Sequence, residues 1–219
     1  MFAVIFEVQP KTERWSDYLD LAGLLRPELE KIDGFVDNER FASLRDRGRV
    51  LSLSIWRDEK AIIRWRTLAL HHQAQVQGRS NIFADYHLRV GEVVADTHVP
   101  LGRSLPQQRF DETETGAAKL VTISELHADA DAGALAADLG LPTTEAESIV
   151  AHEVFAGLND PAKLLLLVSW KDRARWEQWQ PSTTSGSNIR HRAVRIIRDY
   201  GMRDRREAPQ YYPAVAGNG

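Results

Sequence analysis

The sequence predicts an α+β protein made of two tandem βαββαβ units that close on each other. Residues recur 114 positions apart over about fifty residues, and strand-like and helix-like segments follow the same order in both halves of the chain. Each half would also leave one apolar sheet face bare. Tryptophan is rare, so chance does not explain the matches. The recurring pairs are Glu39/Glu153, Phe41/Phe155, Ala42/Ala156, Leu44/Leu158, Trp56/Trp170, Asp58/Asp172, Trp65/Trp179, Asp85/Asp199, Tyr86/Tyr200 and Arg89/Arg203.

The first half begins with a strand and a long helix. Apolar residues alternate over residues 2–8, which predicts a strand. From Trp15 to Ile32 apolar residues fall at three- and four-residue steps, which predicts an amphipathic helix. Pro27 would kink this helix or split it in two, and Gly34 would end it.

Two strands, a helix and a last strand follow. Residues 35–44 and 50–56 are predicted strands joined by a turn. Asp58 is the predicted cap of a second helix that runs through Trp65 into residues 71–79. Alternation over residues 86–90 predicts the final strand. This order is the ferredoxin-like unit.

The second half is predicted to repeat this order in residues 119–204. Its strands include residues 120–126 and 164–170, and its first helix lies at 130–139. Residues 196–203 cover the approach to its last strand and the start of that strand. The predicted domains are 1–94 and 119–204. A linker rich in proline, glycine and acidic residues covers 95–118, and a tail covers 205–219.

Closure of the two units follows from their bare sheet faces. An antiparallel sheet with helices on one side exposes apolar residues on the other. Two such sheets facing each other form a dimeric α+β barrel, here an intramolecular pseudo-dimer because both units lie in one chain. Whether two fused chains associate further as a homodimer is left open.

Composition bounds the class of protein. Hydrophobic residues make up 43% and charged residues 27% of 219 residues, with a net charge of −3, which is typical of a globular protein and gives no basic excess for nucleic acid. The absence of cysteine excludes disulfides and thiolate sites. No apolar run is long enough for a membrane helix, and no secretory signal is recognised, so we expect a cytoplasmic protein without a membrane partner.

His71 and Arg79 are the candidate catalytic residues. Positions 114 residues later hold Ser185 and Ala193, so these groups are expected in one unit alone. His71 could act as a general base or as a ligand, and the alternative is a solvated histidine at a helix end. Arg79 could hold an anionic enolate or carboxylate, and the alternative is a surface role.

Trp65, Tyr86 and His72 are the candidate substrate-binding residues. Trp65 and Tyr86 recur in both halves, which favours packing, although an indole or a phenol could also contact a substrate. His72 is the weaker histidine, because neighbours on a helix point about 100° apart and both rarely enter one cavity. No histidine and carboxylate cluster has metal-ligand spacing, so no metal is predicted.

A basic stretch at residues 190–198 is the one feature that suggests nucleic acid. It contains Arg190, His191, Arg192, Arg195 and Arg198. On a helix these side chains would spread around the surface, and no aromatic residues interleave with them. We therefore expect no nucleic-acid partner.

Several short motifs together resemble the antibiotic biosynthesis monooxygenase family of dimeric α+β barrels. They are Leu25-Arg26-Pro27-Glu28-Leu29, Ile32-Asp33-Gly34-Phe35, Glu39-Arg40-Phe41, Ser52 to Glu59, Trp65-Arg66, His71, Gln75, Gly78-Arg79, Phe83, Asp85-Tyr86 and Leu88-Arg89-Val90. The resemblance covers residues 2–93 closely and residues 119–204 more faintly. The resemblance implies the barrel fold. Family members similar to this chain include cofactor-independent oxygenases of aromatic polyketides and haem-degrading enzymes.

The resemblance does not favour haem. Haem-degrading members keep an asparagine on the first strand and a histidine ten residues after the tryptophan of the second helix. Here the first strand has no asparagine and Gln75 stands ten residues after Trp65. No cofactor is therefore expected.

The leading hypothesis is a cofactor-independent monooxygenase acting on a small, hydrophobic aromatic or polyketide-like substrate in the first unit. The alternatives are a non-catalytic barrel that binds a small molecule or haem, and an isomerase or cyclase of the same fold.

Overall fold

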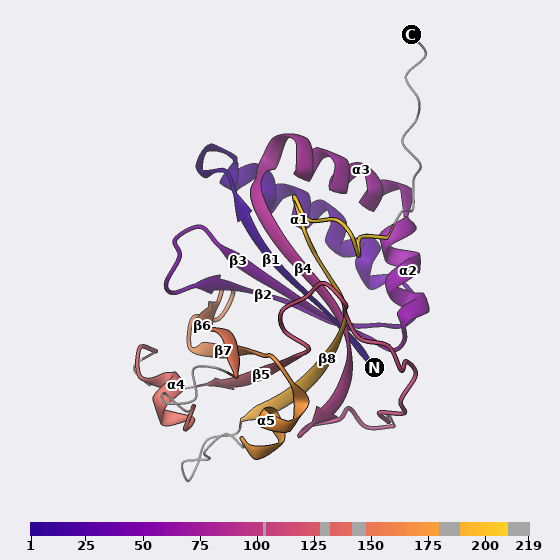
Figure 1. Cartoon of the computed structure of the whole chain (residues 1–219). Coiled ribbons are helices and arrows are strands. Elements are labelled where there is room, and N and C mark those ends of the chain that lie inside the picture. The colour runs from indigo at the N-terminus through magenta and orange to yellow at the C-terminus, as the bar shows by residue number, and fades with distance from the viewer. Residues whose placement is uncertain (103, 128–131, 142–147, 180–188, 210–219) are drawn as a thin grey trace.

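The structure is a computed structural model that describes residues 1–102, 104–127, 132–141, 148–179 and 189–209. Both halves have the order βαββαβ, with the second helix of the first half divided in two (Figure 1). The first half comprises β1 (Phe2–Pro10), α1 (Trp15–Glu30), β2 (Phe35–Ser43), β3 (Val50–Trp56), α2 (Glu59–Thr67), α3 (Ala69–Gln77) and β4 (Phe83–Asp96). The second half comprises β5 (Leu120–His127), α4 (Leu135–Asp138), β6 (Ile149–Gly157), β7 (Lys163–Trp170), α5 (Arg173–Gln178) and β8 (Arg190–Gly201).

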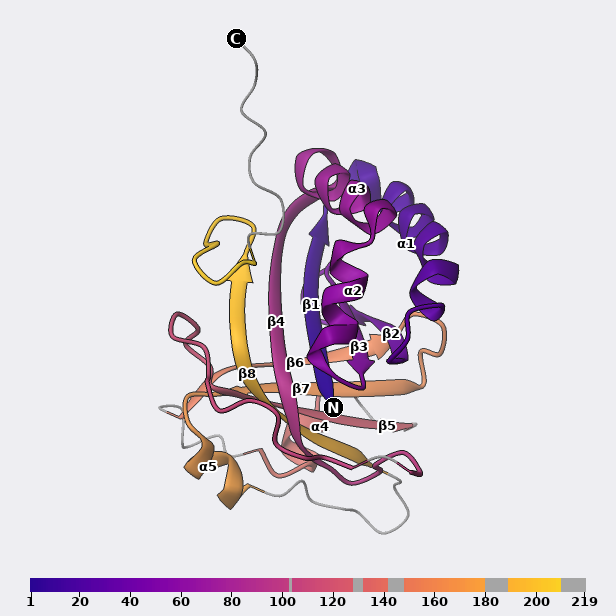
Figure 2. The same cartoon turned by 90° about the vertical axis from the view of Figure 1, so that its right-hand side faces the viewer.

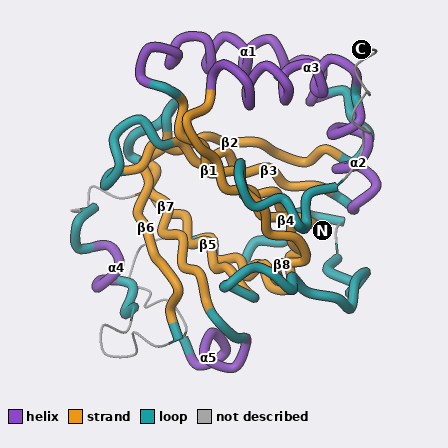
Figure 3. Tube along the Cα trace, turned by 45° about the horizontal axis from the view of Figure 1, so that its top comes forward, coloured by secondary structure: helices purple, strands orange, loops and turns teal. Residues whose placement is uncertain are grey.

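The eight strands form one closed antiparallel barrel in the order β1-β3-β2-β6-β7-β5-β8-β4. The halves meet at two seams, a short one between β2 and β6 and a long one between β4 and β8. Figure 3 shows α1, α2 and α3 on one side of the strands and the short helices α4 and α5 on the other. The predicted fold of two units closing on each other is confirmed.

The barrel interior is a shared apolar core. Alternate residues of strands from both halves point inward and are almost completely buried. They are Met1, Ala3, Ile5, Phe41, Leu51, Leu53, Ile55, Val93, Val121, Ile123, Phe155, Leu165, Leu167, Val194 and Ile196. Each sheet therefore covers the face that the other would expose to water.

The spacing of 114 residues holds in the structure across the two middle strands of each half. The cross-strand pair Phe41 and Leu51 recurs as Phe155 and Leu165, with the same antiparallel register. Asp58 accepts a hydrogen bond from the Ala61 backbone N–H at 2.8 Å, so it caps α2 as predicted.

The spacing fails on the last strand of each half. Glu7 and Glu125 are equivalent, because Leu51 lies opposite Glu7 and Leu165 opposite Glu125. Their partners on the last strands are His87 and Arg190, which are closer in sequence than 114 residues. The segment between the third and fourth strands is shorter in the second half, and this shifts the register of everything after it.

Several predicted equivalences are therefore wrong. Ala193 lies within β8, opposite Ala95 of β4, and is no counterpart of Arg79. Tyr200 is the direct neighbour of Leu88 across the β4–β8 seam, so it does not repeat Tyr86 in the second half. Ser185, the predicted counterpart of His71, lies outside the described residues.

Three element boundaries also differ from those predicted. α1 continues through Pro27 as one helix. The second helix breaks at Leu68, whose backbone is extended, and resumes as α3. α4 covers a short part of the helix predicted at 130–139, of which residues 130 and 131 lie outside the described residues.

The basic stretch at residues 190–198 is part of β8 and is not helical. β8 thus begins before residues 196–203, where the approach to the last strand and its start were predicted. Three of its arginines form ion pairs with carboxylates of neighbouring strands: Arg190 with Asp96, Arg192 with Glu125, and Arg195 with Glu92. Strand pairing explains the stretch, because it places these cations beside acidic residues rather than around a helix surface. Within the described residues, no helix is long and apolar enough to cross a membrane.

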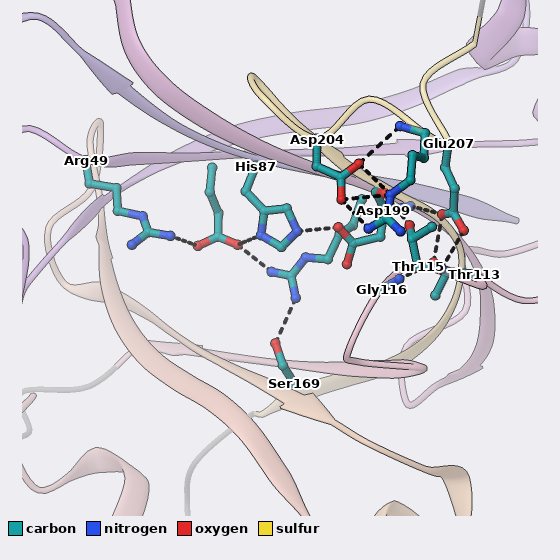
Figure 4. A network of polar contacts seen from close by, with 12 residues as sticks. Arg49, His87, Thr113, Thr115, Gly116, Ser169, Asp199, Asp204 and Glu207 are labelled. Atoms are coloured by element: carbon teal, nitrogen blue, oxygen red, sulfur yellow. Dashed lines mark hydrogen bonds and ion pairs between the residues drawn. The ribbon is translucent and has the colours of Figure 1, made fainter.

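A buried ion pair of the first half is hydrogen-bonded to the second half inside the barrel. Arg89 of β4 donates to Glu7 of β1 at 2.5 Å and to the hydroxyl of Ser169 of β7 at 2.7 Å. Arg49 binds the other oxygen of Glu7 at 2.7 Å, and His87 lies beside it (Figure 4). Burial alone would raise the pKa of Glu7, but Arg89, Arg49 and His87 together hold that pKa below its ordinary value.

We predict that Glu7→Gln lowers the free energy of unfolding by about 3–5 kcal/mol at pH 7, because Arg89 is left as an uncompensated buried charge. Chemical denaturation monitored by tryptophan fluorescence measures this loss. The double variant Glu7→Leu with Arg89→Met removes both charges, so its free energy of unfolding should fall much less. Equal losses in the single and double variants would contradict the interpretation.

Candidate active site

A cavity of about 510 Å³ lies between the outer face of the first-half sheet and the helices α1, α2 and α3. Figure 2 shows these helices lying over β1, β3 and β4. The walls are mainly apolar, with a limited number of polar groups among them. All five residues predicted from the sequence line it: His71, Arg79, Trp65, Tyr86 and His72. Their chemical roles remain predictions.

The cavity floor comes from cross-strand rows. Arg40 of β2 lies opposite Ser52 of β3, which lies opposite Phe6 of β1. Phe6 lies opposite Leu88 of β4, and Leu88 opposite Tyr200 of β8. Because side chains alternate along a strand, all members of this row share the helix-covered face. The floor is therefore apolar at its centre and polar at both ends.

His71 is placed by the break between α2 and α3. The extended backbone of Leu68 lets the ring of His71 stack on Trp65, with ring centres 4.0 Å apart. His71 Nδ1 donates to the Trp65 carbonyl oxygen at 2.9 Å, since that oxygen can only accept. Nε2 of the neutral ring is then unprotonated, so it can accept a proton as a general base does.

Burial lowers the pKa of His71 to about 4. The hydrogen bond to the Trp65 carbonyl opposes this shift, and His72 adds a smaller lowering. His71 is therefore neutral near pH 7, whereas the predicted alternative was a solvated histidine. His72 also lines the cavity, so the expectation that both neighbours rarely enter one cavity is wrong here. Both histidines lie within α3, after the break at Leu68.

Arg79 is on a π-helical turn (Gly78–Ile82) between α3 and β4. Its side chain is exposed while lining the cavity, which places it at the rim. Gly78 permits this turn, because a Cβ atom there would come within 2.5 Å of the Phe83 ring. Arg79 can therefore meet an anion that enters the cavity.

The second half contributes to the same cavity. Arg205 donates to the Tyr86 hydroxyl at 2.5 Å, and its guanidinium lies 5.8 Å from the centre of the Tyr200 ring. Burial, with Tyr86 nearby, raises the pKa of Tyr200 to about 12. Tyr86 and Tyr200 therefore act together at one end of the floor, although sequence spacing suggested one in each half.

Glu207 holds the segment that carries Arg205. Its carboxylate accepts hydrogen bonds from Thr113 Oγ1, at 2.7 Å, and from backbone N–H groups of Glu114, Thr115 and Asp199, at 2.7–2.9 Å (Figure 4). These bonds lower the pKa of Glu207 against the raising effect of burial. The bonds fix residues 204–209 against both the connecting segment and β8, and Ala208 and Pro209 line the cavity.

Sequence reasoning missed several polar groups of this site. Arg40, Ser52 and Ser54 face the cavity. Their equivalents at the valid spacing of 114 are Val154, Leu166 and Val168. His71 was selected because the position 114 residues later holds a different residue. The same comparison, applied to the middle strands, selects Arg40, Ser52 and Ser54. Tyr18 and Arg205 lie outside the aligned repeat, so no such signal marked them.

The equivalent face of the second half is filled. Leu166 and Val168 are completely buried and belong to a cluster with Trp170, Trp176 and Trp179. The helices α4 and α5 span four and six residues, against sixteen for α1. In the described part of the second half, side chains occupy the space that the first half leaves open.

Comparisons with known proteins decide the family. A family model described as antibiotic biosynthesis monooxygenase matches residues 1–77. A protein of Pyricularia oryzae named jasmonate monooxygenase ABM is 42% identical over 222 residues, covering 99% of this chain and 100% of that protein. This chain belongs to the antibiotic biosynthesis monooxygenase family. The resemblance inferred from the sequence is confirmed.

The aldoxime dehydratase among the similar solved structures supports the fold. An aldoxime dehydratase crystallised with butyraldoxime matches 90% of this chain and 79% of that chain, with a TM-score of 0.55 and 11% identity. A putative monooxygenase from Lactobacillus acidophilus matches 90% of this chain and 95% of that chain, with a TM-score of 0.40 and 8% identity. At such identities the family assignment depends on the Pyricularia relative.

We predict that acid destabilises the protein through His71 and His191. Burial lowers the pKa of both to about 4, below the ordinary value of 6.5. As pH falls from about 6.5 to about 4, the unfolded chain binds these protons while the folded chain does not, so stability is lost across this window. Each histidine should lower the free energy of unfolding by up to roughly 3 kcal/mol across this window.

Urea unfolding at pH 7, 5.5 and 4.5 tests this dependence. His71→Asn should remove part of the loss between pH 6.5 and 4, whereas His98→Asn, an exposed control, should not. Identical pH dependence in all three proteins would show that His71 titrates normally.

Proposed function

We propose that this protein is a monooxygenase that oxidises a small, largely apolar substrate in the first-half cavity without a cofactor. The observation that carries the proposal is a neutral, half-buried histidine in a mainly apolar cavity of the first half, whose equivalent face is filled in the described part of the second half. The family and the Pyricularia relative support oxygenation. A cytoplasmic location remains a prediction.

The proposed chemistry starts with proton removal from an activated methylene group. His71 Nε2 takes the proton, and the cationic lining of the cavity stabilises the resulting carbanion or enolate. Dioxygen then adds to this carbon. One oxygen atom remains as a new carbonyl, and the other leaves as water with the two methylene hydrogens. The two C–H bonds supply all four electrons, so this reaction needs no external reductant.

The apolar walls serve this chemistry by limiting water. Stacking of His71 on Trp65 holds the imidazole in one orientation, and the Trp65 carbonyl fixes its tautomer. With its pKa near 4 the ring is a weak base, so stabilisation of the anion by the cavity arginines must supply much of the driving force.

We predict that His71→Ala lowers oxygen uptake with anthrone by about 10²–10⁴-fold, the range for loss of a general base. An oxygen electrode and product analysis measure the rate. His127→Ala is the matched control, because His127 is an exposed histidine of β5 paired with Asp160. Equal uptake by wild type and His71→Ala would remove His71 from the mechanism.

Jasmonate is the second substrate to test, because the Pyricularia relative is named for it. Insertion of one oxygen atom into an unactivated C–H bond needs two more electrons than that bond provides. Assays with jasmonate therefore include a two-electron donor such as NADPH or ascorbate. Oxygen uptake that requires the donor would change the proposed reaction from methylene oxidation to hydroxylation.

A binding protein without catalysis is the second candidate. The low pKa of His71 favours it, since a weakly basic imidazole is better suited to accept a hydrogen bond than to remove a carbon-bound proton. A ligand that stays bound through gel filtration, without oxygen uptake or product, would support this candidate. Product formed without oxygen would instead indicate an isomerase or cyclase.

A further inference from the structure

The residues lining the cavity carry an imbalance of charge. Five of them are arginines and none is aspartate or glutamate. Arg26 is engaged with Glu30 at 2.9 Å, and Arg205 with the Tyr86 hydroxyl. Arg79 is exposed at the rim. The remaining two, Arg40 and Arg66, are half-buried.

Arg40 is a half-buried cation without a carboxylate. It projects from β2 onto the cavity floor, and it forms no ion pair within the described residues. Its Nε atom is fully buried and has no hydrogen-bond partner there. An unsatisfied donor on a charged group is costly in an apolar environment. The fold does not require this cost, because Val154 occupies the equivalent position in the second half.

Tyr18 of α1 provides a second donor beside Arg40. Its hydroxyl is fully buried and, in the described part of the chain, makes no hydrogen bond of good geometry. Burial raises the pKa of Tyr18, while the Arg40 guanidinium lowers it by a smaller amount, through its charge and through a side-chain hydrogen-bond contact with the phenol. The phenol therefore keeps its proton and can donate it.

Asn38 on the same strand face is already engaged. Its side-chain amide donates to the Ser52 hydroxyl at 3.0 Å and to the Leu53 carbonyl at 3.1 Å. The open donors at this end of the floor thus include the Arg40 guanidinium and the Tyr18 hydroxyl. A guanidinium edge with one added O–H donor suits the two oxygens of a carboxylate, which both accept.

We propose that the cavity binds an amphipathic carboxylic acid, with the carboxylate held by Arg40 and Tyr18 and the apolar body lying over Phe6 and Leu88 toward the tyrosine end. This inference rests on the proposed function for the identity of the site and adds the substrate class. It assigns Arg40 as the residue that selects acids over neutral molecules. The bound carboxylate would supply the anionic partner that Arg40 lacks within the described residues.

The test compares acids with their methyl esters by isothermal titration calorimetry under nitrogen, so that binding is measured apart from turnover. The probes are 1-naphthaleneacetate and decanoate with their methyl esters. Wild type should bind each acid more tightly than its ester. Arg40→Met should weaken binding of the acids by roughly 10- to 100-fold and change binding of the esters less than threefold. Tyr18→Phe should have a smaller effect in the same direction.

Arg47→Met is the matched control. Arg47 is exposed in the turn between β2 and β3 and does not line the cavity, yet its replacement changes net charge equally. It should leave all affinities unchanged. Arg40→Met should also unfold at a higher temperature than wild type when no ligand is present, because it removes a buried cation without a partner.

The proposal is overturned if wild type binds neither acid, if it binds esters as tightly as acids, or if Arg40→Met weakens acids and esters equally. Acid-selective binding that depends on Arg40, without oxygen uptake from any acid, would leave this inference standing and would refute the proposed oxygenase function instead.

Discussion

The structure depends on the mutual covering of two sheets. Each four-stranded sheet has one apolar face without helices, and the two faces bury each other inside one closed barrel. This burial fixes which residues point inward and, by alternation, which point outward under the helices. A shift of one residue in any strand would exchange the barrel core for the cavity floor. Fusion of the halves makes the closure independent of concentration.

Because the barrel core is shared, the outer faces were free to diverge. The first half keeps three helices that stand away from its sheet and leave a cavity. In the second half, large apolar side chains from β7 and α5 occupy the same face. The second half still serves the site, since β8 and residues 204–209 bring Tyr200 and Arg205 to the cavity of the first. Described residues of both halves thus assemble this cavity.

Much of this arrangement could be predicted from the sequence. Periodicity identified the strands, and the bare apolar faces predicted closure. Comparison between the halves selected His71, which the structure places in the cavity. That comparison failed after the third strand, because the second half has a shorter segment before its last strand and a fixed spacing cannot follow a deletion. The comparison therefore paired Ala193 with Arg79 and Tyr200 with Tyr86, and both pairings are wrong. The low pKa of His71 also could not be foreseen, since it follows from burial of the ring in the folded protein, where the ring stacks on Trp65 after the break at Leu68.

The central claim is that the open first-half cavity is the functional site. Ser52→Leu tests it most directly, because it places on the floor, between Arg40 and Phe6, the residue type that the second half carries at position 166. We expect binding of 1-naphthaleneacetate, measured by calorimetry, to fall at least tenfold while the free energy of unfolding changes by no more than about 1–3 kcal/mol, the range for small-to-large substitutions. Ser52→Ala, which removes the hydroxyl without filling space, should bind nearly as wild type does. Unchanged binding by a folded Ser52→Leu protein would contradict the claim that ligands occupy this cavity.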